Sequence, residues 1–271
     1  MDVTIKSRTP NPSEPETIVT EPLIAVLGHP IAGNPSQFAL ERAFESLHRD
    51  WRVISFDVKP DDLPVALSGL HVLGINGILL GAELAAEAAQ WFNGQSSRLD
   101  CFYRAGTNSN LSDLLASDVQ SHWIAEQIEA YFEQLNTDLP LQVCLIGETS
   151  LEIEGLICKK RSDARIVRLS DESETFCADA IASSSVFLIG NQKAEANLLD
   201  WDDWLVSPES ALVIDLTDDD DRLDQLSRSG RSTVTSQQCH AGVLSHCIET
   251  WLGERASTEV IQDAIEEYMA V

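Results

Sequence analysis

Residues 23–38 read LIAVLGHPIAGNPSQF and carry the pattern on which the fold depends. Residues 23–27 are apolar and end at Gly28, which predicts a short buried strand followed by a turn. Phe38 then opens the apolar side of a helix predicted over residues 35–49. A strand, a turn and an amphipathic helix in this order are typical of an α/β fold.

The same alternation continues to about residue 95. Short apolar runs predict strands and amphipathic segments predict helices, in the order strand 52–58, helix 60–70, strand 75–80 and helix 83–92. This is a complete β-α-β-α-β-α unit, and we expect it to form one domain.

A second series begins with a helix predicted over residues 119–135, whose start Ser117 or Asp118 could cap. It continues with strand 141–146, helix 151–160 and strands 164–169, 185–189 and 211–216. Strands alternating with helices in this way predict a second domain with a Rossmann-like, doubly wound sheet. The fold class is therefore α/β with two domains.

Two amphipathic helices are predicted at the end of the chain, over residues 243–252 and 260–268. Their apolar stripes need a partner surface, and the N-terminal unit otherwise lacks a full second layer. We expect both helices to pack on that unit and not on the sheet that begins at Leu141. The predicted organisation is a flexible tail (1–21), a substrate-type domain (22–117 plus 240–271) and a Rossmann-like domain (118–239).

Composition limits the partners of this chain. Its 271 residues are 44% hydrophobic and 23% charged, and the formal net charge is −26. Such an acidic protein is repelled by phosphate backbones and anionic lipid surfaces, so we expect neither a nucleic acid nor a membrane as partner. Residues 1–22 lack an apolar signal-peptide core, and no apolar run approaches the ~18 residues of a membrane span. We therefore expect a soluble, cytoplasmic protein, and the acidity fits either a salt-adapted cytoplasm or an ordinary acidic surface.

The six cysteines show no CxxC spacing and are expected to be reduced thiols. The pairs Cys239-His240 and His246-Cys247 lack the ligand spacing of zinc folds, so we predict no metal site. The acidic run 218–221 is interpreted as a solvated turn after a strand, not as a cation site.

Three motifs resemble those of the shikimate dehydrogenases. Residues 28–38 (GHPIAGNPSQF) resemble the GxPIxHSxSP loop after the first strand, residues 74–80 (GINGILL) fall where that family has GxNVTVPFK, and residues 241–247 (AGVLSHC) resemble its GxxMLxxQ helix. The resemblance implies a substrate domain completed by the C-terminal helices, a nicotinamide-binding domain and a cleft between them. It also implies reversible hydride transfer between NADPH and 3-dehydroshikimate, which gives shikimate.

The resemblance implies several substrate-binding residues. Asn34 and Ser36 take the places of two serines that hold the substrate carboxylate, and both side chains can still donate a hydrogen bond. Asn34-Pro35 is equally an ordinary turn, and Ser36 equally a helix-terminus residue. The further substrate-binding residues implied are Asn76, Asn108 (in the segment 108–110) and Cys247.

The family's catalytic lysine is missing. Its position aligns with Ala82, and the chain has no lysine between Lys59 and Lys159. Asp118 is the counterpart of the catalytic aspartate, although a bare helix cap would explain this residue equally well.

The predicted cofactor loop also departs from the family. Where the family has a GAGGAS-like loop after the strand 141–146, this chain keeps one glycine, Gly147, followed by Thr149 and Ser150. Glutamates at positions 148, 152 and 154 would repel a pyrophosphate at this helix start. Arg165 and Arg168 lie where the family binds the 2′-phosphate.

Three hypotheses follow. The first is a degenerate, non-catalytic paralogue without a bound cofactor, which holds a small polyhydroxy carboxylate or a protein partner and could be a homodimer. The alternative is an active NADP-dependent oxidoreductase in which another group replaces the lysine. A third is an assembly subunit that works through its surface.

Overall fold

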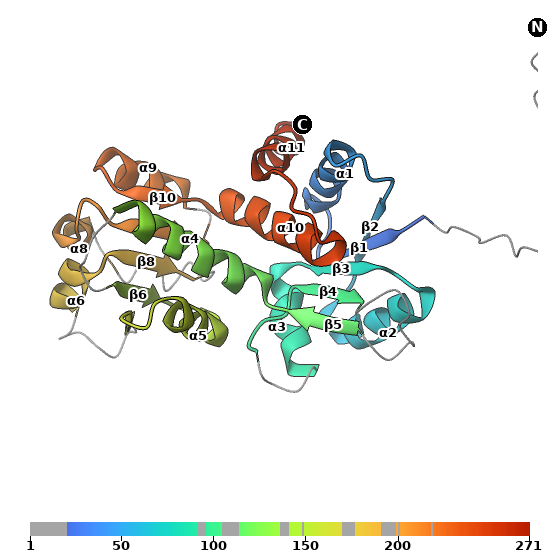
Figure 1. The fold of residues 1–271 in the computed structure, drawn as a ribbon, viewed down its shortest axis with the longest axis horizontal. Coiled ribbons are helices and arrows are strands. Elements are labelled where there is room, and N and C mark those ends of the chain that lie inside the picture. Colours follow the sequence, from blue (N-terminus) through green and yellow to red (C-terminus); the bar gives the residue numbers. More distant parts are fainter. Residues whose placement is uncertain are drawn as a thin grey trace, which may run out of the picture.

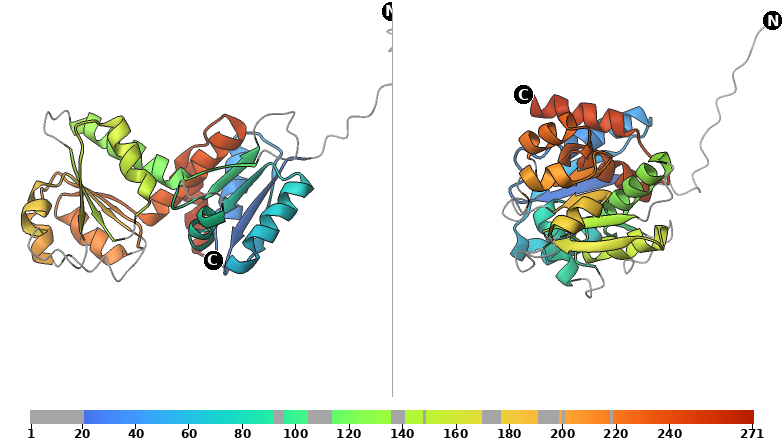
Figure 2. Two further views of the ribbon diagram at one scale, coloured as in Figure 1. Left: turned by 90° about the horizontal axis from the view of Figure 1, so that it is seen from below. Right: turned by 90° about the vertical axis from the view of Figure 1, so that its left-hand side faces the viewer.

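A computed structural model of the chain describes residues 21–91, 96–104, 114–135, 141–147, 149–169, 177–190, 199, 201–217 and 219–271. It contains two β-sheets with helices packed on both faces of each, and the helices α4 and α10 run between them (Figures 1 and 2). The predicted α/β class with two domains is confirmed. The predicted tail lies outside the described residues, except for Glu21.

The first sheet has the strand order β2-β1-β3-β4-β5. β1 pairs in parallel with β2 and β3, whereas β4 pairs antiparallel with β3 and β5. The bounds are β1 Leu23–Gly28, β2 Arg52–Asp57, β3 Gly77–Leu80, β4 Cys101–Arg104 and β5 Leu114–Ser117. β1 is a continuous apolar run because helices cover both of its faces.

Ile24 and Val26 of β1 face one group of helices, and Ala25 and Leu27 face another. On the first face lie α1 (Ser36–Ser46), α10 (Ser236–Leu252) and α11 (Thr258–Met269). On the second face lie α2 (Leu63–Leu73), which follows a 3-10 turn η1 (Pro60–Asp62), and α3 (Ala82–Trp91).

The second sheet is entirely parallel over the described residues and has the strand order β10-β9-β8-β6-β7. The bounds are β6 Gln142–Ile146, β7 Arg165–Leu169, β8 Val186–Ile189, β9 Leu212–Asp215 and β10 Ser232–Val234. The chain passes from β6 to one side and returns to the other with β8. Such a switch point places a crevice at the carboxyl ends of these strands.

Helices cover both faces of this sheet as well. α4 (Val119–Leu135) and α5 (Leu151–Lys160) pack on one face, while α6 (Cys177–Ser183), α8 (Trp201–Val206) and α9 (Asp220–Arg228) cover the other. The fully buried Trp204 of α8 contacts Phe187 of β8 with ring centroids 5.1 Å apart.

The sequence pattern did not predict β4, β5, β10, α6, α8 or α9. These elements have three to nine residues each, which is too short for hydrophobic periodicity to show. The acidic run 218–221 was predicted as a turn, but its described residues, 219–221, form the start of a helix. Asp219 caps α9 by accepting a hydrogen bond from the Arg222 N–H, and Asp220 and Asp221 lie in its first turn.

The prediction for the C-terminal helices is confirmed. α11 packs on α1, and α10 packs on α11, α4 and β4. The indole of Trp251 in α10 lies over Gly77 of β3 and donates a 3.0 Å hydrogen bond to the Phe102 carbonyl of β4. No described helix is both long and apolar enough to cross a lipid bilayer.

A glycine permits the close approach of α4 and α10. A Cβ on Gly242 of α10 would overlap the buried indole of Trp123 in α4. We expect Gly242→Ala to lower the free energy of unfolding by about 1–3 kcal/mol, because this rigid ring must move within a packed core. Urea unfolding measures the change.

Gly155 of α5 is the matched control, because nothing lies within 4 Å of a Cβ at that position. Gly155→Ala should stabilise the protein by about 0.5–1 kcal/mol through helix propensity alone. Equal stability of the two variants would show that the Trp123 contact imposes no steric limit.

Candidate functional site

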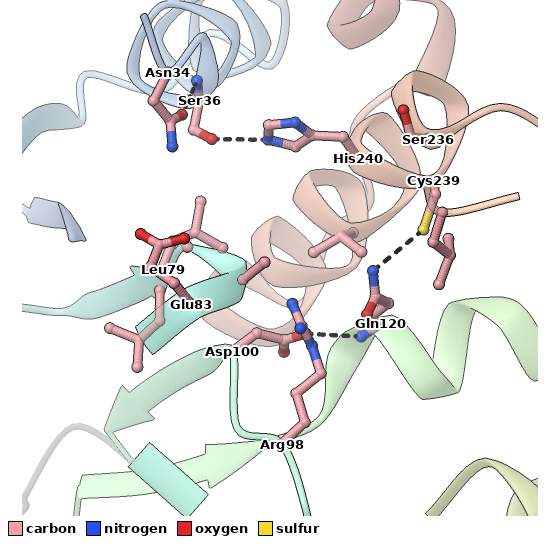
Figure 3. Close-up of a pocket in the computed structure, with 15 residues that line it drawn as sticks. Asn34, Ser36, Leu79, Glu83, Arg98, Asp100, Gln120, Ser236, Cys239 and His240 are labelled. Carbon is pink, nitrogen blue, oxygen red and sulfur yellow. Dashed lines mark hydrogen bonds and ion pairs between the residues drawn. The ribbon is translucent and has the colours of Figure 1, made fainter. Parts of the chain in front are cut away.

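A pocket of about 380 Å³ lies between the two sheets. Its walls come from the loop between β1 and α1 with the start of α1, the end of β3 with the start of α3, the segment before β4, and the amino-terminal parts of α4 and α10. Leu216, which follows β9, is the contribution of the second sheet. In Figure 3, Ser36 and His240 lie toward one end of the pocket, and Arg98 and Asp100 toward the other.

At the first end, Ser36 and His240 form a hydrogen bond between Oγ and Nε2 of 2.8 Å, although they are 204 residues apart in sequence. Burial lowers the pKa of His240 to about 4, so the imidazole is neutral at pH 7. Asn34 uses its Oδ1 to accept the Ser36 N–H at 2.8 Å, which orders the start of α1. The asparagine NH₂ group is thus the remaining donor of this side chain.

At the other end, Arg98 forms an ion pair with Asp100, whose side chain is almost completely buried. The carboxylate also accepts the backbone N–H groups of Val119 and Gln120, at 2.7 and 3.1 Å, and so caps α4 from outside the helix. Desolvation raises the pKa of Asp100, and the nearby Asp118 adds to this, whereas Arg98 and the two N–H groups oppose it. Arg98 Nε is 3.2 Å from Asp100 Oδ2.

Glu83 adds a second acidic group to the lining. Its carboxylate folds back over the ends of β1 and β3, where Oε1 accepts the His29 N–H at 2.6 Å. Glycines make room for it, because a Cβ on Gly81 would lie 2.8 Å from this oxygen and one on Gly28 3.3 Å.

Cys239 and Gln120 line the pocket beside Arg98 and Asp100. Gln120 Nε2 lies 3.6 Å from Cys239 Sγ, and burial raises the pKa of this thiol to about 12. Cys239 is therefore a neutral thiol at pH 7 and a poor nucleophile.

Known proteins that resemble this chain were compared with it by sequence and by structure. No protein-family model matches the chain. A shikimate dehydrogenase (NADP(+)) of Methanothermobacter thermautotrophicus is 40% identical over 53 residues, and one of Moorella thermoacetica is 42% identical over 55 residues. Each match covers 20% of this chain and 19% of the relative, so it spans about a fifth of the curated relatives' length.

Solved structures match much more of the chain. The shikimate 5-dehydrogenase of Thermus thermophilus in complex with shikimate aligns with a TM-score of 0.65 and 15% identity, over 92% of this chain and 100% of that one. This chain has the fold of the shikimate dehydrogenases. It is also similar in structure to the 5-ketofructose reductase of Gluconobacter sp. strain CHM43, with a TM-score of 0.68 and 13% identity over 92% and 99% of the two chains.

Three of the residues predicted from the resemblance to shikimate dehydrogenases line the pocket. These are Asn34 and Ser36, predicted to bind the substrate carboxylate, and Ala82, which occupies the lysine position. Ala82 is exposed at the start of α3, beside Glu83.

Other predicted substrate-binding residues lie elsewhere. Asn76 is at the opposite, amino end of β3, where its Oδ1 accepts the Leu23 N–H at 3.0 Å. Cys247 is fully buried and its thiol contacts that of Cys101, which together with burial raises the pKa of Cys247. Asn108, in the segment 108–110, lies outside the described residues.

Asp118 is the N-cap of α4 and does not line the pocket. Its Oδ1 accepts the Ser121 N–H at 3.0 Å, and its Oδ2 accepts the hydroxyls of Ser121 and Ser150 at 2.7 and 2.6 Å. The side chain is 1% exposed. The arrangement is that of a structural cap, and the catalytic role implied by the resemblance stays a prediction.

The predicted cofactor-binding residues form a closely paired group at the start of α5. Gly147 has a positive φ of 75°, and Ser150 caps the helix by accepting the Glu152 N–H. Thr149 Oγ1 accepts a hydrogen bond from Arg168, whose Nε forms an ion pair of 2.5 Å with Glu154. Glu148 lies outside the described residues.

This helix start is also linked to the first domain. Ser96 donates a 2.9 Å hydrogen bond to Glu152 Oε2, and Ser97 donates one of 3.3 Å to Ser150 Oγ. The side chains of Ser150 and Glu152 at this helix start are thus bonded to residues of the first domain.

Sequence reasoning missed Arg98, Asp100, Glu83, Gln120 and His240 as pocket residues. The two short strands β4 and β5 were not predicted, so nothing placed residues 98–100 at the edge of the first sheet. His240 could have been found because it directly precedes the motif 241–247, once that helix was known to return to the first domain. Among the described residues, no group of three or more histidine, cysteine or acidic side chains could hold a metal ion.

Proposed function

We propose that this protein is a shikimate-dehydrogenase-like binding protein that holds a small polar molecule in the interdomain pocket without transferring hydride. The observation that carries the proposal is a polar pocket beside a helix start whose side chains, Ser150 and Glu152, are already hydrogen-bonded to other residues. The ligand class expected from the resemblance is a small polyhydroxy carboxylate, and the pocket offers hydroxyl, amide and guanidinium groups to such a molecule.

The pocket lacks the proton-transfer group that a shikimate dehydrogenase needs. Ala82 stands at the lysine position, and none of the described residues that line the pocket is a lysine. His240 is neutral, but a pKa of about 4 makes it a weak base for an alcohol.

The start of α5 disfavours a dinucleotide for two reasons. Ser150 already accepts the Glu152 N–H, one of the donors that a phosphate would need. Glu152 and Glu154 also place negative charge in the first turn, where the phosphates would lie. Arg168 would have to exchange Glu154 for a 2′-phosphate.

A titration with NADPH and NADH tests the proposal. We expect dissociation constants of about a millimolar or worse by calorimetry, at low and at high salt. High salt screens exposed charges. If weak binding came only from repulsion by the net charge of −26, it would become tighter at high salt, whereas a site blocked by protein atoms would stay weak. A micromolar constant at either ionic strength would contradict the proposal.

The second candidate is an active NADP-dependent oxidoreductase. The shikimate 5-dehydrogenase of Thermus thermophilus has also been solved with NADP(H) and shikimate, and this chain aligns with it at a TM-score of 0.62 and 14% identity, over 91% and 99% of the two chains. The presence of His240 in the pocket favours this candidate, because an imidazole could replace the lysine as proton acceptor.

A further inference from the structure

We propose that the pocket selects a zwitterion, which binds with its carboxylate at Arg98 and its ammonium group at Glu83. This inference rests on the proposed function, because it concerns the same pocket, and it replaces the polyhydroxy carboxylate expected from the resemblance with a zwitterion. It reverses the orientation that the sequence resemblance implies, in which the carboxylate lies at Asn34 and Ser36.

The first argument concerns Arg98. Its side chain is 14% exposed, and its Nε is paired with Asp100, which is itself buried and also accepts two backbone N–H groups. Over the part of the chain that the structure describes, neither Nη atom of Arg98 has a protein acceptor within hydrogen-bond distance. Two parallel N–H donors at a pocket wall match the geometry of a carboxylate.

The second argument concerns the Asn34 and Ser36 end. The hydroxyl of Ser36 is used by His240, and Oδ1 of Asn34 is used by a backbone N–H. The Glu83 carboxylate lies close to Asn34, because both side chains approach within 4 Å of the same point, the Cβ position of Gly28. A ligand carboxylate at this end would meet a like charge, whereas an ammonium group would meet an opposite one.

The third argument is the charge balance. The described lining residues carry two acidic side chains and one guanidinium, so the pocket is formally negative, within a protein of net charge −26. A ligand that is only an anion is repelled by the negative pocket and by the negative protein as a whole. A zwitterion adds no net charge and can pair with Arg98 and Glu83, while Asp100 is already paired with Arg98 and with two backbone N–H groups.

Two matched probe pairs test the proposal by calorimetry: L-alanine against L-lactate, and cis-4-aminocyclohexanecarboxylate against cis-4-hydroxycyclohexanecarboxylate. In each pair an ammonium group replaces a hydroxyl, and the pairs cover a short and a long separation of the two groups. We expect the amino compound of at least one pair to bind at least about tenfold more tightly at neutral pH, because an ion pair with Glu83 replaces a hydrogen bond in which only Glu83 is charged.

Variants of Glu83 and Arg98 test which residue binds the ammonium group and which binds the carboxylate. Glu83→Gln should abolish the preference for the amino compound, and Glu87→Gln is the matched control because Glu87 lies on the same helix but not in the pocket. Arg98→Lys should weaken the binding of both compounds of the preferred pair, since lysine keeps the positive charge but cannot donate two parallel hydrogen bonds to a carboxylate. Melting curves establish that each variant is folded.

Equal or tighter binding of the hydroxy acids, or an unchanged preference in Glu83→Gln, would overturn the proposed zwitterion. These outcomes leave the proposed function standing. Micromolar binding of NADPH would overturn that function whatever the probes show.

Discussion

The unmodified protein is expected to show no measurable shikimate:NADP oxidoreductase turnover at neutral pH. Oxidation of a secondary alcohol needs a group that accepts the hydroxyl proton, and a positioned acid–base group typically contributes about 10²–10⁴ in rate. Ala82 cannot contribute, and Asp118 is buried with its oxygens bonded to Ser121 and Ser150. The assay follows reduced-nicotinamide absorbance at high enzyme and substrate concentrations.

Ala82→Lys alone should restore no turnover. The variant supplies a proton-transfer group at the pocket, but the start of α5 is still bonded to Ser96, Ser97 and Asp118. A shikimate dehydrogenase assayed in parallel is the positive control for the assay.

Turnover above about 1 per second by the unmodified protein would contradict this expectation. Two variants would then identify the replacement group. Loss of turnover in Asp118→Ala would restore the role that the resemblance implies, and loss in His240→Asn would assign the proton transfer to the imidazole.

Removal of Arg222 should have the largest effect on stability. Asp215 at the end of β9 is fully buried, and its Oδ2 accepts hydrogen bonds from the Arg222 Nε and Nη2 at 2.8 and 2.7 Å. Its Oδ1 accepts two more from Thr217, the backbone N–H at 2.8 Å and the hydroxyl at 2.7 Å. Arg222→Met leaves this carboxylate buried without its counter-ion, which should lower the free energy of unfolding by about 3–5 kcal/mol.

Urea unfolding at neutral pH measures the change, with Arg228→Met as the control. Arg228 lies on the same helix, and both members of its ion pair with Asp224 are more than two-thirds exposed, so less than about 1 kcal/mol should be lost. The double variant Asp215→Asn/Arg222→Met should recover part of the stability, because no buried charge then remains. A loss in Arg222→Met no larger than in Arg228→Met would show that solvent reaches Asp215.

Local patterns in the sequence were sufficient for most of the fold. The apolar runs of β1, β3, β6, β8 and β9 and the stripes of α10 and α11 are visible because burial on one or both faces dictates which residues are apolar. The motifs around Gly28, Gly74 and Gly242 predicted the fold of the shikimate dehydrogenases. The sequence also shows alanine, Ala82, at the position of that family's catalytic lysine.

Tertiary structure alone decided which of these residues share a pocket. The partner of Ser36 is His240, and α4 receives a second cap from Asp100, which lies before β4. Such contacts join residues that have no periodic relation along the chain, so no local pattern encodes them. Asp118 and Asn76 carry the right chemistry for a substrate, but they lie outside the pocket lining and are hydrogen-bonded to Ser150 and Leu23. The physical reason is that a polar side chain enclosed by protein is held by whichever partner the fold brings to it.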